Sequence, residues 1–202
     1  PSHHLKLVGI TGTNGKTTIV TLLHSLFRLS GFSCAKLSTI SNSINEIEFD
    51  STHTTPDPIK LNAFLHKAVE SGCEYAFMEV SSHAIDQYRI AGLNFSGGIF
   101  TNITHEHLDY HKTFKAYLET KKKFFDALPM HAFALVNHDD KNGSYMLQNT
   151  KARKLSYGLK GFADFKGKIL ESHFNGSLVS IKGQGIGLKL PREYNAHNII
   201  EA

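Results

Sequence analysis

Short apolar runs alternate with amphipathic stretches along the first three quarters of the chain. Four runs have the apolar density of buried strands: residues 5–10, 75–80, 97–102 and 133–137. Three longer stretches carry apolar residues at the three- and four-residue spacing of a helix face: residues 15–30, 58–71 and 113–128. Because strands that alternate with helices usually build a parallel sheet covered on both faces, we expect an α/β fold with a mostly parallel sheet flanked by helices.

The pattern changes after Gly158. Short alternating segments follow, separated by an Asn175-Gly176 turn and a Gly-Gln-Gly break, which predicts a small antiparallel β-sheet near the C-terminus. We therefore expect an α/β core over residues 5–158 and an antiparallel subregion over residues 159–192. Residues 194–202 look like the beginning of a helix that the sequence does not complete, so we expect the chain to be a fragment of a longer protein.

Composition excludes several classes of protein. The chain has 202 residues, of which 41% are hydrophobic and 20% are charged, and no stretch approaches the ~20 apolar residues of a membrane-spanning helix. Its net charge of +4 is spread along the sequence, which gives no reason to expect a nucleic-acid partner. The two cysteines, Cys34 and Cys73, cannot build a disulfide framework or a Cys-x-x-Cys zinc site. We expect a cytoplasmic monomer with no membrane partner.

The strongest local signal is the turn between the first strand and the first helix, TGTNGKTT at residues 11–18. Glycines there let backbone N–H groups approach phosphate oxygens, Lys16 would neutralise them, and the Thr17 hydroxyl would ligate Mg²⁺. The common pattern GxxxxGK(S/T) has glycine where this chain has Ile10, so the match is to a variant. The alternative is a glycine-rich turn with an incidental lysine. The expected ATP-binding residues here are Gly12, Thr13, Asn14, Gly15, Lys16, Thr17 and Thr18.

Two further side chains have the chemistry of a phosphate-transfer site. Glu79 closes an apolar strand, and the carboxyl ends of parallel strands face the ligand crevice, so it is placed to bind Mg²⁺ unless it is simply solvated. Lys121 falls inside the apolar stripe of the 113–128 helix, whereas Lys122 and Lys123 point elsewhere. Burial and like charge should lower the pKa of Lys121 and leave a neutral amine that can react with CO₂. The alternative is a solvated run of three lysines, which suits Lys122 and Lys123.

Other polar positions are weaker signals. His105, His107 and His111 crowd one segment beside two acids, but they lack the H-E-x-x-H spacing, so zinc is the weaker interpretation. Four residues in turn-prone or post-strand segments could hold a polar ligand or could only cap turns and helices: Thr54, Thr55, Ser81 and Arg89. Asn195 and Asn198 open the terminal helical pattern, where simple capping is the alternative.

Seven motifs together resemble the Mur ligases, and among them most closely the diamino-acid-adding MurE branch. They are TGTNGKTT (11–18), HTTPD (53–57), MEVSSHAIDQYRI (78–90), TNITHEHLDYH (101–111), YLETK (117–121), VNHDD (136–140) and YNAHN (194–198). The resemblance implies the central ATP-binding domain of the enzyme, without its N-terminal UDP-binding and C-terminal amino-acid-binding domains. It implies ATP-dependent addition of meso-diaminopimelate or L-lysine to UDP-N-acetylmuramoyl-L-alanyl-D-glutamate, through an acyl phosphate, in peptidoglycan synthesis.

The resemblance also implies roles for individual residues. Lys16, Glu79 and Lys121 would be catalytic, and two Mg²⁺ ions would be held by Thr17, Glu79, His107 and a CO₂-derived carbamate on Lys121. Thr54, Thr55, Ser81 and Arg89 would face the muramyl peptide, and Asn195 and Asn198 would contact adenine. No contact is assigned to His83, His105, His111, Asn137, Asp139 or Asp140. Two alternatives remain open: a related ligase such as folylpolyglutamate synthase, and a nucleotide-binding module without catalysis.

Overall fold

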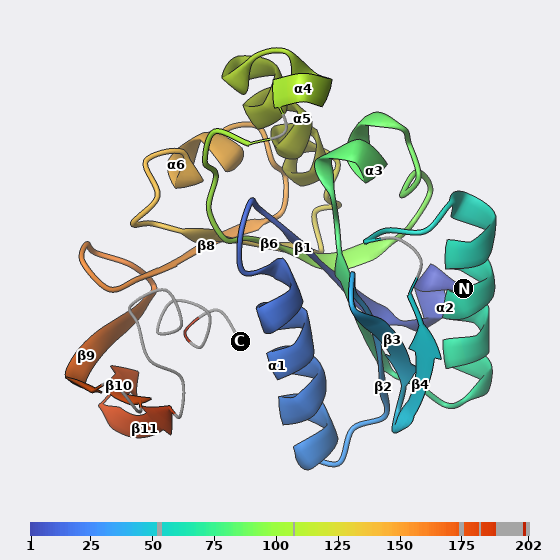
Figure 1. Cartoon of the computed structure of the whole chain (residues 1–202), viewed down its shortest axis with the longest axis horizontal. Helices are drawn as coiled ribbons and strands as arrows, with labels where there is room; N and C mark the ends of the chain where they lie inside the picture. The colour runs from blue at the N-terminus through green and yellow to red at the C-terminus, as the bar shows by residue number, and fades with distance from the viewer. Residues whose placement is uncertain (52–53, 107, 174–175, 182, 189–199, 201–202) are drawn as a thin grey trace.

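A single sheet of strand order β11-β10-β9-β8-β7-β6-β1-β5-β2-β3-β4 forms the centre of the molecule in the computed structural model (Figure 1). The structure describes residues 1–51, 54–106, 108–173, 176–181, 183–188 and 200. Six neighbouring strands are parallel: β2 (Cys34–Leu37), β5 (Tyr75–Glu79), β1 (Lys6–Thr11), β6 (Phe95–Phe100), β7 (Phe133–Asn137) and β8 (Arg153–Gly158). The predicted fold class, a mostly parallel sheet flanked by helices, is confirmed.

Antiparallel pairs of strands, β9–β10–β11 and β2–β3–β4, continue the sheet at both edges. On one side lie β9 (Phe165–His173), β10 (Gly176–Ile181) and β11 (Gln184–Leu188), and the predicted antiparallel strands near the C-terminus are confirmed. They are not a detached sheet, because β9 pairs in parallel with the end of β8. The expected helix over residues 194–202 lies outside the described residues apart from Ile200.

The opposite edge is a hairpin that periodicity did not predict. It consists of β3 (Ser41–Ile44) and β4 (Ile47–Asp50), joined by a two-residue turn in which Asn45 has a φ of 53°. Each strand has only four residues, and β3 carries three polar ones. Side chains close to the hairpin stabilise it: Asn42 accepts a hydrogen bond from the Ser38 N–H, and the Ser38 hydroxyl donates one to the Ser41 carbonyl. The sequence signal that was available is the asparagine at the turn, a residue that tolerates positive φ.

Helices cover both faces of the sheet. Figure 1 shows α1 (Lys16–Leu29) on one face and α3 (Ser82–Asp86) and α5 (Phe114–Asp126) on the other. The remaining helical segments are η1 (Ser2–His4), α2 (Pro58–Glu70), α4 (Leu108–His111) and α6 (Gly143–Met146). Local caps explain where two helices begin: the Asp57 carboxylate accepts two backbone N–H groups ahead of α2, and the Thr113 hydroxyl accepts one ahead of α5. Among the described residues, no helix is long and apolar enough to cross a membrane.

Strand alternation divides the core into two layers. In β1, Leu7 packs on the side of α2 and α5, while Val8 and Ile10 pack on the side of α1. Glycine at positions 9 and 98 gives the Phe124 ring of α5 room against the sheet, because a Cβ at Gly9 would lie 2.6 Å from Phe124 Cζ. The close approach of α5 brings its polar residues to the carboxyl ends of β1 and β6.

Candidate functional site

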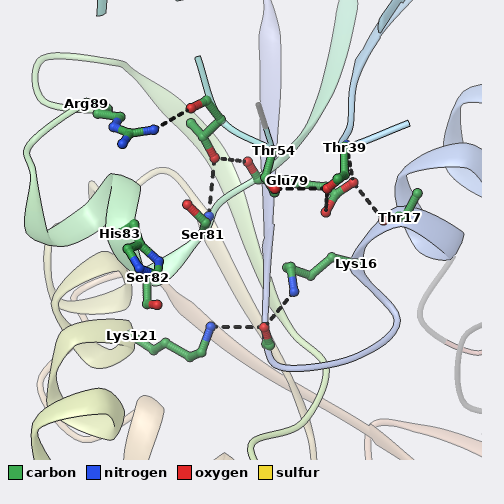
Figure 2. A pocket seen from close by; sticks show the side chains of 12 residues that line it. Lys16, Thr17, Thr39, Thr54, Glu79, Ser81, Ser82, His83, Arg89 and Lys121 are labelled. Atoms are coloured by element: carbon green, nitrogen blue, oxygen red, sulfur yellow. Dashed lines mark hydrogen bonds between the residues drawn. The ribbon is translucent and has the colours of Figure 1, made fainter. Parts of the chain in front are cut away.

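A cavity of about 460 Å³ opens beyond the carboxyl ends of β1 and β5 (Figure 2). β1 continues into α1 on one face and β5 into α3 on the other, so the two connections diverge and leave a crevice, as at the ligand sites of other α/β sheets. The cavity is lined by Gly12, Lys16, Thr17, Thr39, Thr54, Thr55, Glu79, Ser81, Ser82, His83, Arg89 and Lys121.

The turn Gly12–Gly15 between β1 and α1 forms one wall. Gly15 has a φ of 90° and precedes α1 without a side-chain cap. Lys16 Nζ donates hydrogen bonds to the carbonyl oxygens of Gly12 at 2.9 Å and Thr13 at 2.8 Å. Burial lowers the pKa of Lys16, and the charges of Glu79 and Glu106 oppose that shift. The turn therefore holds an ammonium group beside the start of a helix, where the helix dipole also favours an anion.

Glu79 lies at the base of the cavity and is only 1% exposed. Its carboxylate accepts hydrogen bonds from the Thr17 hydroxyl at 2.8 Å, the Thr39 N–H at 2.8 Å and the Thr39 hydroxyl at 3.2 Å. Within the described part of the chain it forms no ion pair. This buried carboxylate accepts hydrogen bonds only from neutral groups and faces a cavity. Its oxygens are therefore suitable ligands for a hard cation such as Mg²⁺.

Lys121 comes from α5 and approaches Lys16 from the other side of the cavity (Figure 2). It is 1% exposed, and its Nζ donates to the same Gly12 carbonyl at 2.9 Å and lies 4.8 Å from the centroid of the Tyr117 ring. Burial first, and then the charge of Lys16, lower the pKa of Lys121 well below its ordinary value. The predicted inward orientation of this lysine is confirmed.

The expectation of a solvated Lys122 is wrong. Lys122 is 5% exposed and forms an ion pair with Asp126 at 2.7 Å, while Lys123 is exposed as expected. Helix α5 is covered by the sheet on one side and contacts α6 on another, and the Lys122 ammonium lies 5.6 Å from the ring centroid of Tyr145. A helical projection assumes that only one face of the helix is buried, so it cannot predict that α6 covers a second face.

The four residues expected on the muramyl-peptide side lie together at one end of the cavity. Thr55 is 1% exposed; its hydroxyl donates to the Glu79 carbonyl at 2.8 Å and accepts from the Ser81 N–H at 3.3 Å. Ser81 caps α3 through the Ala84 N–H, and Arg89 donates to the Thr55 carbonyl at 2.9 Å. Thr54 accepts from the Thr39 hydroxyl at 3.0 Å. All four residues line the cavity, and Thr55 is the buried one whose hydroxyl forms two hydrogen bonds within the protein.

The histidine-rich segment does not assemble a zinc site among the described residues, which contain no group of three or more His, Cys, Asp or Glu side chains suited to a metal. His105 stacks on Phe114 with ring centroids 4.4 Å apart, and His111 Nε2 lies 2.9 Å from the Ser82 hydroxyl. His83 lines the cavity and packs against Tyr110. His107, the expected metal ligand, lies outside the described residues, as do Asn195 and Asn198.

Four of the seven ATP-binding residues expected at this turn do not line the cavity: Thr13, Asn14, Gly15 and Thr18. The Thr13 side chain turns towards α5, where its hydroxyl lies 3.2 Å from the Tyr117 hydroxyl. Both the backbone N–H and the backbone carbonyl of Asn14 bond the Asn102 side chain. The residues of this turn that line the cavity are therefore Gly12, Lys16 and Thr17.

Sequence reasoning missed Thr39 and Tyr117 as parts of the site. Thr39 lies between β2 and the polar hairpin, and only its bonds to Glu79 identify it. Tyr117 belongs to the apolar stripe of α5, where a tyrosine has no distinguishing signal. The VNHDD motif acquires a structural role: Asn137 donates to the Thr101 carbonyl and Asp139 accepts from the Leu159 N–H.

Comparisons with known proteins agree with this architecture. The family model described as the Mur ligase middle domain matches residues 10–202. A UDP-N-acetylmuramoyl-L-alanyl-D-glutamate–2,6-diaminopimelate ligase from Parabacteroides distasonis is 58% identical over 200 residues, covering 99% of this chain and 41% of that protein. The ligase of the same name from Bacteroides fragilis is 52% identical over the same shares. The chain thus spans about two fifths of the length of these relatives.

Solved structures give the same result. A diaminopimelate ligase of the same name is 30% identical with a TM-score of 0.86, covering 98% of this chain and 42% of that one. MurF from Acinetobacter baumannii has a TM-score of 0.77 over 99% of this chain and 42% of its own, but at 18% identity it supports the fold alone. From the family match along nearly its whole length, together with this fold, the chain belongs to the Mur ligase family and is its middle domain.

Proposed function

We propose that this chain is the ATP-binding domain of an ATP-dependent amide ligase that adds meso-diaminopimelate to UDP-N-acetylmuramoyl-L-alanyl-D-glutamate in peptidoglycan synthesis. One observation carries the proposal: in a Mur ligase middle domain, Lys16, Thr17, Glu79 and Lys121 converge on one cavity at the carboxyl ends of β1 and β5. The choice of diaminopimelate over L-lysine is supported by the names of the relatives that are 50–58% identical.

The turn Gly12–Gly15, which we call the phosphate loop from here on, and the start of α1 bind the triphosphate in this proposal. Lys16 moves from its carbonyl partners to the phosphate oxygens and neutralises the charge that develops during transfer of the γ-phosphoryl group to the substrate carboxylate. The resulting acyl phosphate is attacked by the amine of the diamino acid. The protein supplies position and charge, and excludes the water that would hydrolyse the acyl phosphate.

Thr17 and Glu79 are the residues that would hold one Mg²⁺, and Glu79, His107 and Lys121 the second. When bound, magnesium supplies positive charge on the transferring phosphoryl group. The hydroxyl of Thr17 already meets the Glu79 carboxylate at 2.8 Å, so two oxygen ligands are in place without rearrangement of the backbone. Thr39 fixes the orientation of that carboxylate through two further hydrogen bonds.

Lys121 would join this set as a carbamate. Its neutral amine attacks CO₂, a C–N bond forms and the nitrogen releases one proton, so that an uncharged amine becomes an anion with two oxygen ligands. Near-complete burial and the charge of Lys16, which both lower the Lys121 pKa, support a neutral amine at this position. The ammonium that now donates to the Gly12 carbonyl would be replaced by a carbamate, whose oxygens are acceptors and could serve as metal ligands.

Thr54, Thr55, Ser81 and Arg89 form the end of the cavity that would receive the muramyl peptide. The Arg89 guanidinium provides a positive charge for a carboxylate at that end, and the Ser81 and Thr54 hydroxyls provide neutral polar contacts. In this proposal Asn195 and Asn198 contact adenine. The proposal takes the protein to be a monomer that acts in the cytoplasm, where ATP is available.

The test uses the full-length protein and measures phosphate release together with the amide product by mass spectrometry. We expect release that requires ATP, the UDP-muramyl dipeptide and meso-diaminopimelate, and its loss in Lys16→Ala, whereas Lys60→Ala on exposed α2 retains it. Near-normal ligation by Lys16→Ala would contradict the assignment. Release with a folate acceptor would favour the related folate ligases, and ATP binding without any turnover would favour a regulatory module.

The carbamate has its own test in the same assay. Lys121→Ala should lose activity, and short-chain carboxylic acids should restore part of it by supplying the missing oxygen ligands. An inactive variant that still binds two magnesium ions as the wild type does would contradict this role for Lys121.

A further inference from the structure

The segment Thr101–Thr104, which follows β6, lies directly against the phosphate loop. Asn102 makes three hydrogen bonds to it: its carbonyl accepts from the Thr13 N–H at 2.8 Å, its side-chain oxygen accepts from the Asn14 N–H at 3.0 Å, and its side-chain amide donates to the Asn14 carbonyl at 3.1 Å. One asparagine therefore pairs with both polar groups of Asn14 and with the N–H of Thr13.

Two neighbouring hydroxyls strengthen this contact. The Thr101 hydroxyl donates to the Asn14 carbonyl at 2.6 Å, so that carbonyl accepts two hydrogen bonds. The Thr13 hydroxyl accepts from the Thr104 N–H at 3.0 Å and lies 3.2 Å from the hydroxyl of Tyr117, which is fully buried in α5. The phosphate loop is thus held by Thr101–Thr104 on one side and by α5 beneath it.

Glycine at position 12 makes the close approach possible. Gly12 has a φ of 151°, and a Cβ there would overlap the Thr101 hydroxyl and lie 3.0 Å from the Asn102 carbonyl oxygen. The glycine thus serves the packing of Thr101–Thr104 against the loop as well as any approach of phosphate to the backbone.

The segment Thr101–Thr104 is itself hydrogen-bonded to residues at the end of β7 and just after it. Asn137, at the end of β7, donates to the Thr101 carbonyl at 2.9 Å, and Asp140 accepts from the Ile103 N–H at 2.9 Å. Both partners follow a buried central strand, which is among the least mobile parts of such a fold. Asn137 and Asp140 of the VNHDD motif therefore fix the position of Thr101–Thr104. That segment in turn fixes the phosphate loop.

We propose that Asn102 is a positioning residue that, with Tyr117, holds the phosphate loop in its nucleotide-binding conformation before the nucleotide arrives. This inference rests on the proposed ATP site. The N–H groups of Thr13 and Asn14 are used by Asn102, so phosphate is bound by the donors that follow, at Gly15 and the start of α1. Without the hydrogen bonds from Asn102, the loop becomes ordered only when the nucleotide binds. The free-energy cost of that ordering reduces the binding free energy, so nucleotide affinity falls.

The experiment measures the dissociation constant of a fluorescent ATP analogue with Mg²⁺ for the 202-residue chain. Asn102→Ala removes the two side-chain bonds and should weaken binding about tenfold, and Tyr117→Phe, which removes one hydroxyl, about threefold to fivefold. Asn62→Ala is the matched control, because the Asn62 amide also donates to a backbone carbonyl, that of Pro58 in α2 far from the loop. It should leave the dissociation constant unchanged.

Steady-state kinetics of the full-length ligase separate positioning from a general loss of structure. Asn102→Ala should raise the KM for ATP with little change in kcat or in the KM for the diamino acid, whereas mere destabilisation lowers the active fraction and leaves the KM for ATP unchanged. Wild-type affinity in both Asn102→Ala and Tyr117→Phe would overturn the inference, and Tyr117→Phe decides if Asn102→Ala does not fold. Failure of the wild-type chain to bind the analogue would instead refute the proposed ATP site.

Discussion

The Thr55 hydroxyl stabilises the fold of the site, and replacing it tests that role directly. The side chain is buried, donates to the Glu79 carbonyl at 2.8 Å and accepts from the Ser81 N–H at 3.3 Å. Thr55→Val keeps the shape but removes both bonds. The Glu79 carbonyl and the Ser81 N–H then lose a hydrogen-bond partner, and each buried polar group left unpaired lowers stability by about 1–3 kcal/mol. Because the bond to Ser81 is long and contributes less, we expect the free energy of unfolding to fall by about 2 kcal/mol.

Urea unfolding followed by far-UV circular dichroism measures this loss, since the chain contains no tryptophan. With a slope of about 2 kcal/mol per molar urea, the midpoint should fall by roughly 1 M without a change in slope. Thr54→Val is the matched control: the hydroxyl of Thr54 is not buried and bonds Thr39, so the cost should stay below about 0.5 kcal/mol.

The two interpretations of Thr55 give opposite results in the chain without substrate. If its hydroxyl served only to bind the muramyl peptide, Thr55→Val would leave the unfolding midpoint unchanged or raise it slightly, because valine is the more apolar side chain. Equal midpoints for Thr55→Val, Thr54→Val and the wild type would therefore refute the structural role.

Three further predictions concern buried ionisable groups. Asp126→Ala leaves the Lys122 ammonium without its partner and should lower stability by about 1–3 kcal/mol. Adding Lys122→Met in the same chain should restore most of that loss. Thermal melts of the single and double variants check this, and an Asp126→Ala variant that melts like the wild type would contradict it. Because burial lowers the pKa of Lys121, the unfolded chain binds the extra proton between the folded pKa and 10.5, so wild-type stability rises with pH there. In CO₂-free buffer the advantage of Lys121→Met should therefore be largest at neutral pH and shrink towards pH 10.5 in a urea series; an advantage independent of pH would speak against a shifted lysine. Burial raises the pKa of Cys34 to about 11 and also raises that of Cys73, so neither thiol should react with Ellman's reagent at pH 8 until urea unfolds the chain, and rapid native labelling would count against the core described.

Local periodicity predicted four of the six parallel strands, namely β1, β5, β6 and β7, the three long helices, and the inward orientation of Lys121. That success has a simple cause: a helix repeats every 3.6 residues, so the side of the helix on which a residue lies follows from its neighbours in the sequence. The same reasoning failed for Lys122, because a second covering element, α6, is remote in the sequence. It also missed β2, β8 and the β3–β4 hairpin, which are strands of only four to six residues.

The sequence by itself determined the order of the main elements, the glycine- and lysine-bearing turn before α1 and the acid at the end of β5, since each depends on residues within one short segment. Only the tertiary structure decided which polar groups face the cavity and which are used internally. Thr13 and Thr55 were candidates in the sequence and Asn102 was not, but the placement of β1 between β5 and β6 brings hydrogen-bond partners to all three from segments 24 to 104 residues away. Such pairing depends on strand order, which no local pattern encodes.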